Sequence, residues 1–123
     1  MELGGRNANI RLPEIPNASV SSADRSALWL GPREWLILTP RGLEPELQRS
    51  LRATLTNRSC AVTDVTNGNT VMCLTGMRAL DVLAKGCSVD LHDLGFGPGS
   101  CVQTYVAKLV CCCGDGMIPQ DLI

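Results

Sequence analysis

The chain has few aromatic residues, no cluster of basic residues and no long apolar run. Aromatic residues make up 3% of its 123 residues, and 11 Lys and Arg residues against 12 Asp and Glu residues give a net charge of −1. The longest uninterrupted apolar run, residues 109–113, is far shorter than the ~18 residues of a membrane-spanning helix. These absences exclude a membrane-spanning segment and argue against a nucleic-acid or anionic membrane partner, because phosphate binding depends mainly on clustered positive charge.

The composition predicts one soluble domain. With 45% hydrophobic residues, a chain of this length buries about two-thirds of its unfolded surface, so a hydrophobic core is expected without disulfides. The first residues lack the basic and apolar stretches of an export signal, which predicts a cytoplasmic location. The seven cysteines are odd in number and form no Cys-x-x-Cys pair, so we interpret most of them as small core residues in a reducing compartment.

Three regions are predicted along the chain. Residues 1–25 are rich in glycine, proline, asparagine and serine, which is typical of an extended N-terminal arm. Residues 26–116 are predicted to form a single α+β domain, and residues 117–123 are predicted to form a short C-terminal tail.

The domain's secondary structure follows from its apolar patterns. Residues 28–30 and 35–38 predict a β-hairpin across a Gly-Pro-Arg-Glu turn. Leucines repeat every four residues over 43–55, which predicts an amphipathic helix with Pro45 in its first turn. Runs 61–66 and 70–74 flank Asn67-Gly68-Asn69 and predict a second hairpin.

The second half of the domain predicts another helix and two strands. Thr75 is expected to cap a helix that ends at Gly86. Strands are predicted at 101–106 and 108–113, followed by a turn at 114–116.

With the runs 101–106 and 108–113 counted together as the closing β unit, the order is ββαββαβ. It predicts an α+β two-layer sandwich of the split β-α-β, or ferredoxin-like, type, in which two helices cover one face of a mostly antiparallel sheet. Consecutive apolar residues in the strands indicate that the other face is apolar too. We therefore expect the N-terminal arm or another protein to cover that face. The candidate interface residues are Trp29, Trp35, Leu36 and Leu38, since aromatic anchors dominate many protein contacts.

The sequence offers few candidates for catalysis or ligand binding. His92, the only histidine, has the carboxylates of Asp90 and Asp93 close by in the sequence. A neighbouring carboxylate can orient a histidine as a general base, although a structural role is favoured. Cys87 or Cys101 with His92 is the alternative of a thiolate pair. Residues 111–113 are three successive cysteines, which we interpret as a buried strand rather than a zinc site, because neighbouring strand residues point to opposite faces. No catalytic or metal-binding residue is assigned.

Asp64 is the weak candidate for a cofactor-binding residue. It lies within an apolar run, where a carboxylate must find a hydrogen-bond partner or face solvent.

Four segments together resemble the gamma subunit of heterotetrameric sarcosine oxidase. They are residues 28–36, residues 62–68, residues 83–92 and residues 98–104. The resemblance covers about residues 26–110. After residue 116 the family continues with a strand and a closing helix, whereas only seven residues, including Pro119, follow here, so we expect a shortened member.

The resemblance implies a fold similar to the folate-binding aminomethyltransferases and a place beside the large alpha subunit, with beta and delta subunits in the same complex. That complex demethylates sarcosine to glycine and yields hydrogen peroxide and, with tetrahydrofolate, methylenetetrahydrofolate. Its FAD, FMN, NAD, tetrahydrofolate and zinc lie on the other subunits, so no cofactor is expected on this chain. The resemblance implies an accessory role in assembly and stability.

Two alternatives stay open. A stand-alone folate-binding one-carbon transfer protein would use Asp64 near the pterin, but 123 residues leave little room for a folate channel. A cysteine-based redox sensor would need a thiol that titrates well below ~8.5.

Overall fold

The computed structural model describes residues 2–3, 10–22, 24–92 and 96–115. Its strands and helices, in chain order, are β1 (Glu2–Leu3), β2 (Ile10–Arg11), β3 (Ser19–Ser22), β4 (Arg25–Gly31), β5 (Glu34–Leu38), α1 (Glu44–Thr54), the 3₁₀ helix η1 (Thr66–Gly68), α2 (Ala79–Ala84), β6 (Ser100–Val106) and β7 (Leu109–Asp115). Within these residues the strands form three antiparallel sheets, β1–β2, β3–β4–β5 and β6–β7. Neither α-helix has the length and apolar character needed to span a bilayer.

The central sheet confirms the first predicted hairpin. β4 and β5 pair antiparallel, with Trp29 directly opposite Trp35. Pro32 suits the second position of the turn, and Arg33 at the third has a φ of 70°, a left-handed conformation that usually favours glycine or asparagine. The hairpin therefore depends on Pro32 and on the pairing of the two apolar runs, rather than on a glycine in the turn.

Helix α1 confirms the predicted amphipathic helix to within a residue at each end. Leu47 and Leu51 are its buried residues, and Pro45 lies in the first turn. These leucines pack into a core with Ala27 of β4, while Trp35 and Ile37 of β5 contact its edge. Burying such an apolar stripe is the main stabilisation of a helix this short.

The N-terminal segment supplies part of the same core. Ile10 and Leu12 are 1% and 4% exposed and belong to the cluster around Leu47 and Leu51. The indole N–H of Trp35 donates to the carbonyl oxygen of Pro13 over 2.7 Å. Residues 10–22, within the segment predicted as an extended arm, thus lie on this chain's own sheet and core.

The β6–β7 hairpin joins the central sheet near residue 18. The amide of Cys101 donates to the carbonyl of Asn17 over 2.8 Å, and that of Ser19 donates to the carbonyl of Gly99 over 2.7 Å. On its other side, Cys87 forms an isolated bridge with Val106, which ties the segment after α2 to β6.

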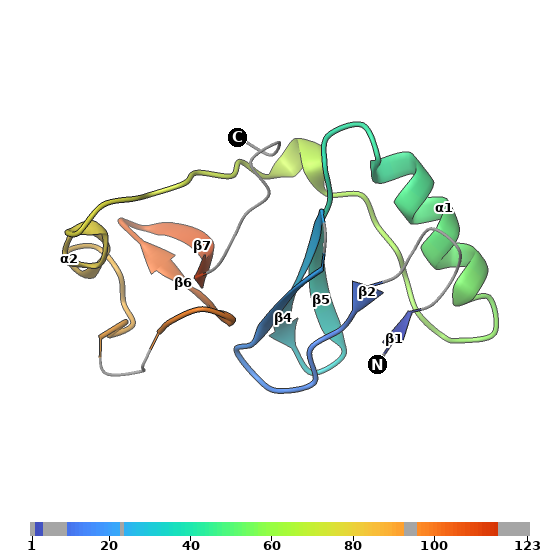
Figure 1. Ribbon diagram of the computed structural model, residues 1–123, viewed down its shortest axis with the longest axis horizontal. Coiled ribbons are helices and arrows are strands. Elements are labelled where there is room, and N and C mark those ends of the chain that lie inside the picture. Colours follow the sequence, from blue (N-terminus) through green and yellow to red (C-terminus); the bar gives the residue numbers. More distant parts are fainter. Residues whose placement is uncertain (1, 4–9, 23, 93–95, 116–123) are drawn as a thin grey trace.

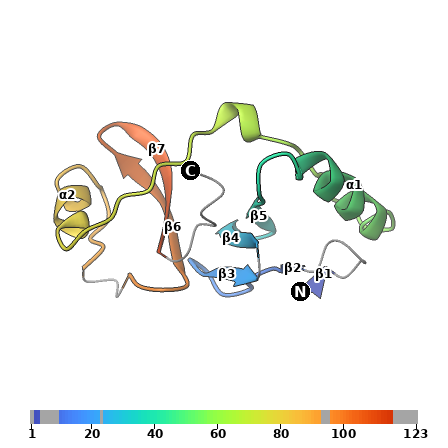
Figure 2. The same cartoon turned by 45° about the horizontal axis from the view of Figure 1, so that its top comes forward.

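Figures 1 and 2 show the resulting arrangement: the central sheet lies between α1 and the β6–β7 hairpin, and α2 lies beyond that hairpin. The α+β class, the antiparallel sheets and the two helices are confirmed. The predicted single sheet with both helices on one face is wrong, because each helix lies next to a different sheet. One reason is that the strands predicted between the helices, which were to complete the sheet, do not form.

The second predicted hairpin is wrong. Residues 61–65 and 69–75 lie in no strand, and η1 occupies the expected turn. Strand propensity is local, but a strand forms only where it finds a hydrogen-bonded neighbour. The ββαββαβ order therefore does not hold.

Two other boundaries differ from prediction. Helix α2 begins at Ala79 after Arg78, which makes no side-chain capping bond, so Thr75 is not its cap. Gly76, with a φ of 118°, separates Thr75 from the helix. Strand β7 continues through Gly114 and Asp115, where a turn was predicted, and the predicted tail at 117–123 lies outside the described residues.

Candidate partner interface

A strip of exposed apolar side chains runs along the connection between α1 and α2. Residues 56–78 are exposed except for Val62, which is half-buried. We call the apolar strip the five residues Val71, Met72, Leu74, Met77 and Val82; Met72 is 79% exposed and Leu74 48%. Such a cluster of large apolar side chains on the surface is a typical feature of protein interaction sites.

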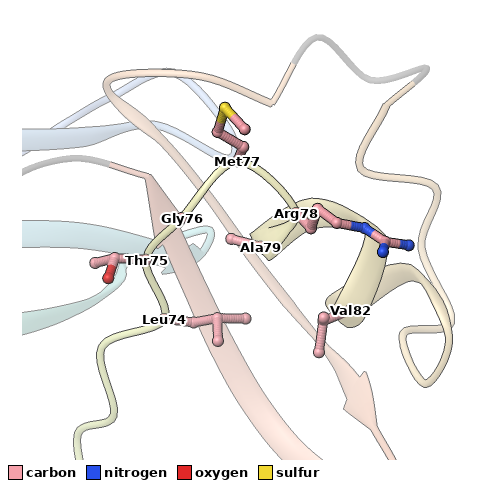
Figure 3. Close-up of a pocket in the computed structure, with 7 residues that line it drawn as sticks. All are labelled: Leu74, Thr75, Gly76, Met77, Arg78, Ala79 and Val82. Carbon is pink, nitrogen blue, oxygen red and sulfur yellow. The ribbon is translucent and has the colours of Figure 1, made fainter.

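The strip borders a depression of about 370 Å³. Its lining consists of Leu74, Thr75, Gly76, Met77, Arg78, Ala79 and Val82. In Figure 3, Leu74 and Val82 point toward the same space from the extended segment and from α2, and Met77 points away from it. This space has the composition to accept an apolar side chain.

Contacts at both ends hold this connection in place. Near its start, the carbonyl oxygen of Val62 accepts from Arg52 over 3.0 Å and from Gln48 over 3.4 Å, both on α1. At its other end, the amide of Ala79 donates to the carbonyl of Gly76 over 3.1 Å, which turns the chain into α2. The strip is thus held between two helices.

The four interface residues predicted from the sequence lie on two faces of the central sheet. Trp29 and Trp35 are directly opposite and share the face toward α1, where Trp35 packs on the core. Leu36 and Leu38 alternate with them and lie on the other face. All four are half-buried. The apolar strip was not predicted as a surface, because its residues have the pattern of a paired hairpin and a core helix.

The face that holds Leu36 and Leu38 was expected to be covered by the N-terminal arm or by another protein, and it is partly covered by β6 of the chain itself. Leu28, directly opposite Leu36, is only 7% exposed, and β4 contacts β6. The most exposed apolar side chains therefore lie elsewhere.

His92 lies beside Asp81 and Arg78 on the surface. Its Nε2 lies 3.9 Å from the carboxylate of Asp81, which also lies 3.5 Å from Nε of Arg78. The amide of His92 donates to the carboxylate of Asp90 over 3.0 Å. These contacts are sufficient to explain the residue as a structural link between α2 and the following loop.

Cys101 is a buried structural thiol. It is 1% exposed, and its Sγ donates to the carbonyl oxygens of Ala18 and Trp29 over 3.1 and 3.3 Å. Burial raises the pKa of this thiol, the opposite of what an activated thiolate requires. Cys87 instead contacts the hydroxyl of Thr104 over 3.8 Å, and among the described residues no hydrogen bond joins either thiol to His92.

The run of cysteines in β7 does not assemble a metal site in the described part of the chain. Cys111 and Cys112 are half-buried neighbours that point to opposite faces of the hairpin, and the side chain of Cys113 lies outside what is described. Across residues 2–3, 10–22, 24–92 and 96–115, no group of three or more His, Cys, Asp or Glu side chains is arranged to hold a metal ion.

Asp64 caps the turn into η1. Its carboxylate accepts from the hydroxyl of Thr66 over 2.6 Å and from the amide of Thr66 over 2.9 Å. These two hydrogen bonds, the hydroxyl's first, lower the pKa of the Asp64 carboxyl. Asp64 is also exposed. The hydrogen-bond partner predicted for this aspartate is therefore Thr66, two residues away.

Taken together, a small α+β domain with an exposed apolar strip, whose candidate reactive side chains make local structural contacts, has the features of a protein-binding domain. Comparison with known families matches residues 7–117 to the sarcosine oxidase, gamma subunit family. The chain belongs to this family.

Curated relatives agree. The chain is 35% identical over 99 residues to the sarcosine oxidase subunit gamma of Corynebacterium sp. (strain P-1) and 34% identical over 99 residues to that of Arthrobacter sp. Each alignment covers 80% of this chain and 48% of the relative, so the chain spans about half the length of the curated relatives it matches. No solved structure matches the chain.

Proposed function

We propose that this protein is a non-catalytic accessory subunit of a sarcosine oxidase complex and that it docks on the large alpha subunit through the apolar strip. The observation that carries the proposal is the exposure of Met72, Leu74 and Met77 in a chain of the gamma subunit family. Its relatives are named as subunits, which supports a role inside a larger assembly.

The chemistry of the strip suits a protein contact. Methionine side chains are flexible and polarisable, so Met72 and Met77 adapt to an apolar partner surface. Asp64 is the only charged residue between positions 59 and 77, which keeps the desolvation cost of docking low. A side chain of the partner would fill the depression between Leu74 and Val82. Leu36 and Leu38 are proposed as secondary contacts.

The proposal extends to the complex as a whole. Beta and delta subunits would complete it, with FAD, FMN, NAD, tetrahydrofolate and zinc on the subunits other than this one. The reaction proposed for the complex is the oxidative demethylation of sarcosine to glycine. A likeness to the aminomethyltransferase fold and a cytoplasmic location belong to the same proposal; the odd number of cysteines fits a reducing compartment.

Co-expression with the large subunit tests the proposal. The two chains should elute together in size-exclusion chromatography as a complex of fixed stoichiometry. The large subunit expressed without this chain should be less soluble or less stable to heating, as expected when a partner's binding stabilises the folded state. Separate elution of two well-folded proteins at micromolar concentration would contradict it.

A further inference from the structure

Residues 70–75 are an extended segment whose backbone is unpaired. They lie in no helix or strand, and no hydrogen bond joins their amide or carbonyl groups to another described residue. All six residues are exposed. Backbone groups in extended segments of folded proteins are usually either paired with a neighbouring strand or solvated in a loop. The side-chain pattern distinguishes a strand that lacks its neighbour from a solvated loop.

The side chains are those of a strand covered on both faces. Residues 71–74 read Val-Met-Cys-Leu, four consecutive apolar residues, whereas a strand with one solvated face alternates apolar with polar residues. In a β-strand, side chains at 71 and 73 point opposite to those at 72 and 74. Both sets are exposed, so neither face of this segment has the cover that its composition calls for.

Contacts before residues 70–75 and a turn after them constrain both ends of the segment. Before it, the side-chain amide of Asn69 donates to the carbonyl of Val65 over 2.8 Å, and its backbone amide donates to that of Thr66 over 3.3 Å. After it, Gly76 turns the chain into α2 with a φ of 118°. Fixing both ends lowers the entropy that docking must remove.

We propose that residues 70–75 bind the large subunit as an added β-strand, on a sheet edge of that subunit that is uncharged and flanked by apolar side chains. This inference rests on the proposed function and specifies its mode of contact. In strand addition, main-chain hydrogen bonds supply affinity, and pockets for alternate side chains supply specificity. The lack of charge in residues 65–77 selects the uncharged edge, and the depression beside Leu74 receives one apolar side chain of the partner.

A named subunit of an assembly, rather than a second copy of this chain, is the occupant that the family points to. The exposed run of residues 63–78, together with α2, approaches the 20–30 residues a side of a standard protein interface. A second copy pairing through the same segment is the rival outcome, and the experiment below separates the two.

Amide exchange of the reconstituted complex, followed by NMR, tests the strand. In the free chain the amides of residues 70–75 should exchange rapidly. In the complex, alternate amides should exchange at least about 100-fold more slowly, because every second amide faces the partner edge. Docking through side chains alone would not produce this alternation.

Proline substitution gives the second readout. Val71→Pro, Met72→Pro and Cys73→Pro each remove one amide that has no partner in the free chain, and each is compared with alanine at the same position to correct for the lost side chain. Val71→Pro and Cys73→Pro should change Kd by a similar factor, and Met72→Pro by a different one. The two sets should differ by about three- to tenfold in Kd, which corresponds to the net value of a backbone hydrogen bond.

The outcomes are distinct. Alternating protection together with the alternating proline effect supports the added strand. A stable complex whose amides at 70–75 exchange as in the free chain, or are all slowed alike, overturns it and leaves the proposed function standing. Protection that appears in the isolated chain on raising its concentration overturns it in favour of a second copy. Failure of any complex to form contradicts the proposed function itself.

Discussion

The Sγ atom of Cys101 lies 3.1 Å from the carbonyl oxygen of Ala18, 83 residues away in the chain. The same thiol donates to the carbonyl of Trp29, so one buried side chain links β6 to the start of β3 and to β4. Beside it, the amide of Cys101 donates to the carbonyl of Asn17. This junction joins the half of the chain that contains α1 to the half that contains the apolar strip and α2.

The buried thiol predicts a loss of stability at alkaline pH. Because burial raises the pKa of Cys101, the folded chain holds this proton more tightly than the unfolded chain does. Its contribution is complete below the pKa of an unfolded thiol, ~8.5, and is lost as pH rises through the raised pKa of the folded state. Urea unfolding from pH 7 to 10 should show a steeper loss for the wild type than for Cys101→Ala. Parallel curves would contradict this assignment.

The indole of Trp35 is predicted to stabilise the fold through its bond to Pro13. Trp35→Phe removes that donor and leaves the carbonyl oxygen of Pro13, in a buried residue, without it, at an expected cost of about 1–2 kcal/mol in the free energy of unfolding. Trp29→Phe is the matched control, because Trp29 lies directly opposite and its indole makes no hydrogen bond with the described residues. Equal losses in urea unfolding would refute the special role of Trp35.

The turn between β6 and β7 holds two non-glycine residues in the left-handed region, Ala107 with a φ of 48° and Lys108 with a φ of 74°. This is the conformation of a two-residue type I′ turn, which favours asparagine and glycine. Lys108→Gly should raise the thermal midpoint, with a gain of about 1 kcal/mol, because glycine adopts this φ without steric cost. Lys108→Ala, which keeps the strain, should change little. A lower midpoint for Lys108→Gly would count against the turn geometry.

Hydrogen bonds from Thr66 predict the titration of Asp64. The folded pKa of this carboxyl is lowered, so its contribution to stability is present above the unfolded pKa and is lost as pH falls through the folded pKa. In an NMR titration, Thr66→Val should raise the pKa of Asp64 toward its ordinary value, leaving only the amide bond to depress it. Thr63→Val, in the same exposed segment, should leave it unchanged. If the pKa of Asp64 is the same in the wild type and in both variants, the hydrogen bond from the Thr66 hydroxyl to Asp64 is disproved.

Elements with complete local signals were predictable from the sequence. The β4–β5 hairpin has Pro32 placed for its turn, and α1 has the leucine repeat that includes Leu47 and Leu51, so propensity and burial agree. The last two strands were also located from their apolar runs. In each case the residues that form the element and the residue that ends it lie close together in the sequence.

Long-range contacts account for what was missed. Nothing in the periodicity near Ile10 and Leu12 indicates that they pack against α1, nor does any local signal show that Cys101 binds Ala18. For residues 61–74 the prediction was wrong in the opposite sense, because strands were predicted where none form. Their composition is that of paired strands, but pairing depends on a neighbour that this chain does not supply in the described structure, which is why the apolar strip was overlooked as a surface.

Docking through the apolar strip is tested most directly by placing charges on the strip and measuring the affinity of this chain for the large subunit. Met72→Asp with Leu74→Asp should weaken binding by at least about 30-fold, or ~2 kcal/mol, as for residues central to an interface. The control, Asn57→Asp with Ser59→Asp, adds the same charge at exposed positions of the same connection and should bind within about threefold of the wild type, as expected for peripheral residues. Equal affinities for the two double variants would contradict docking through the strip.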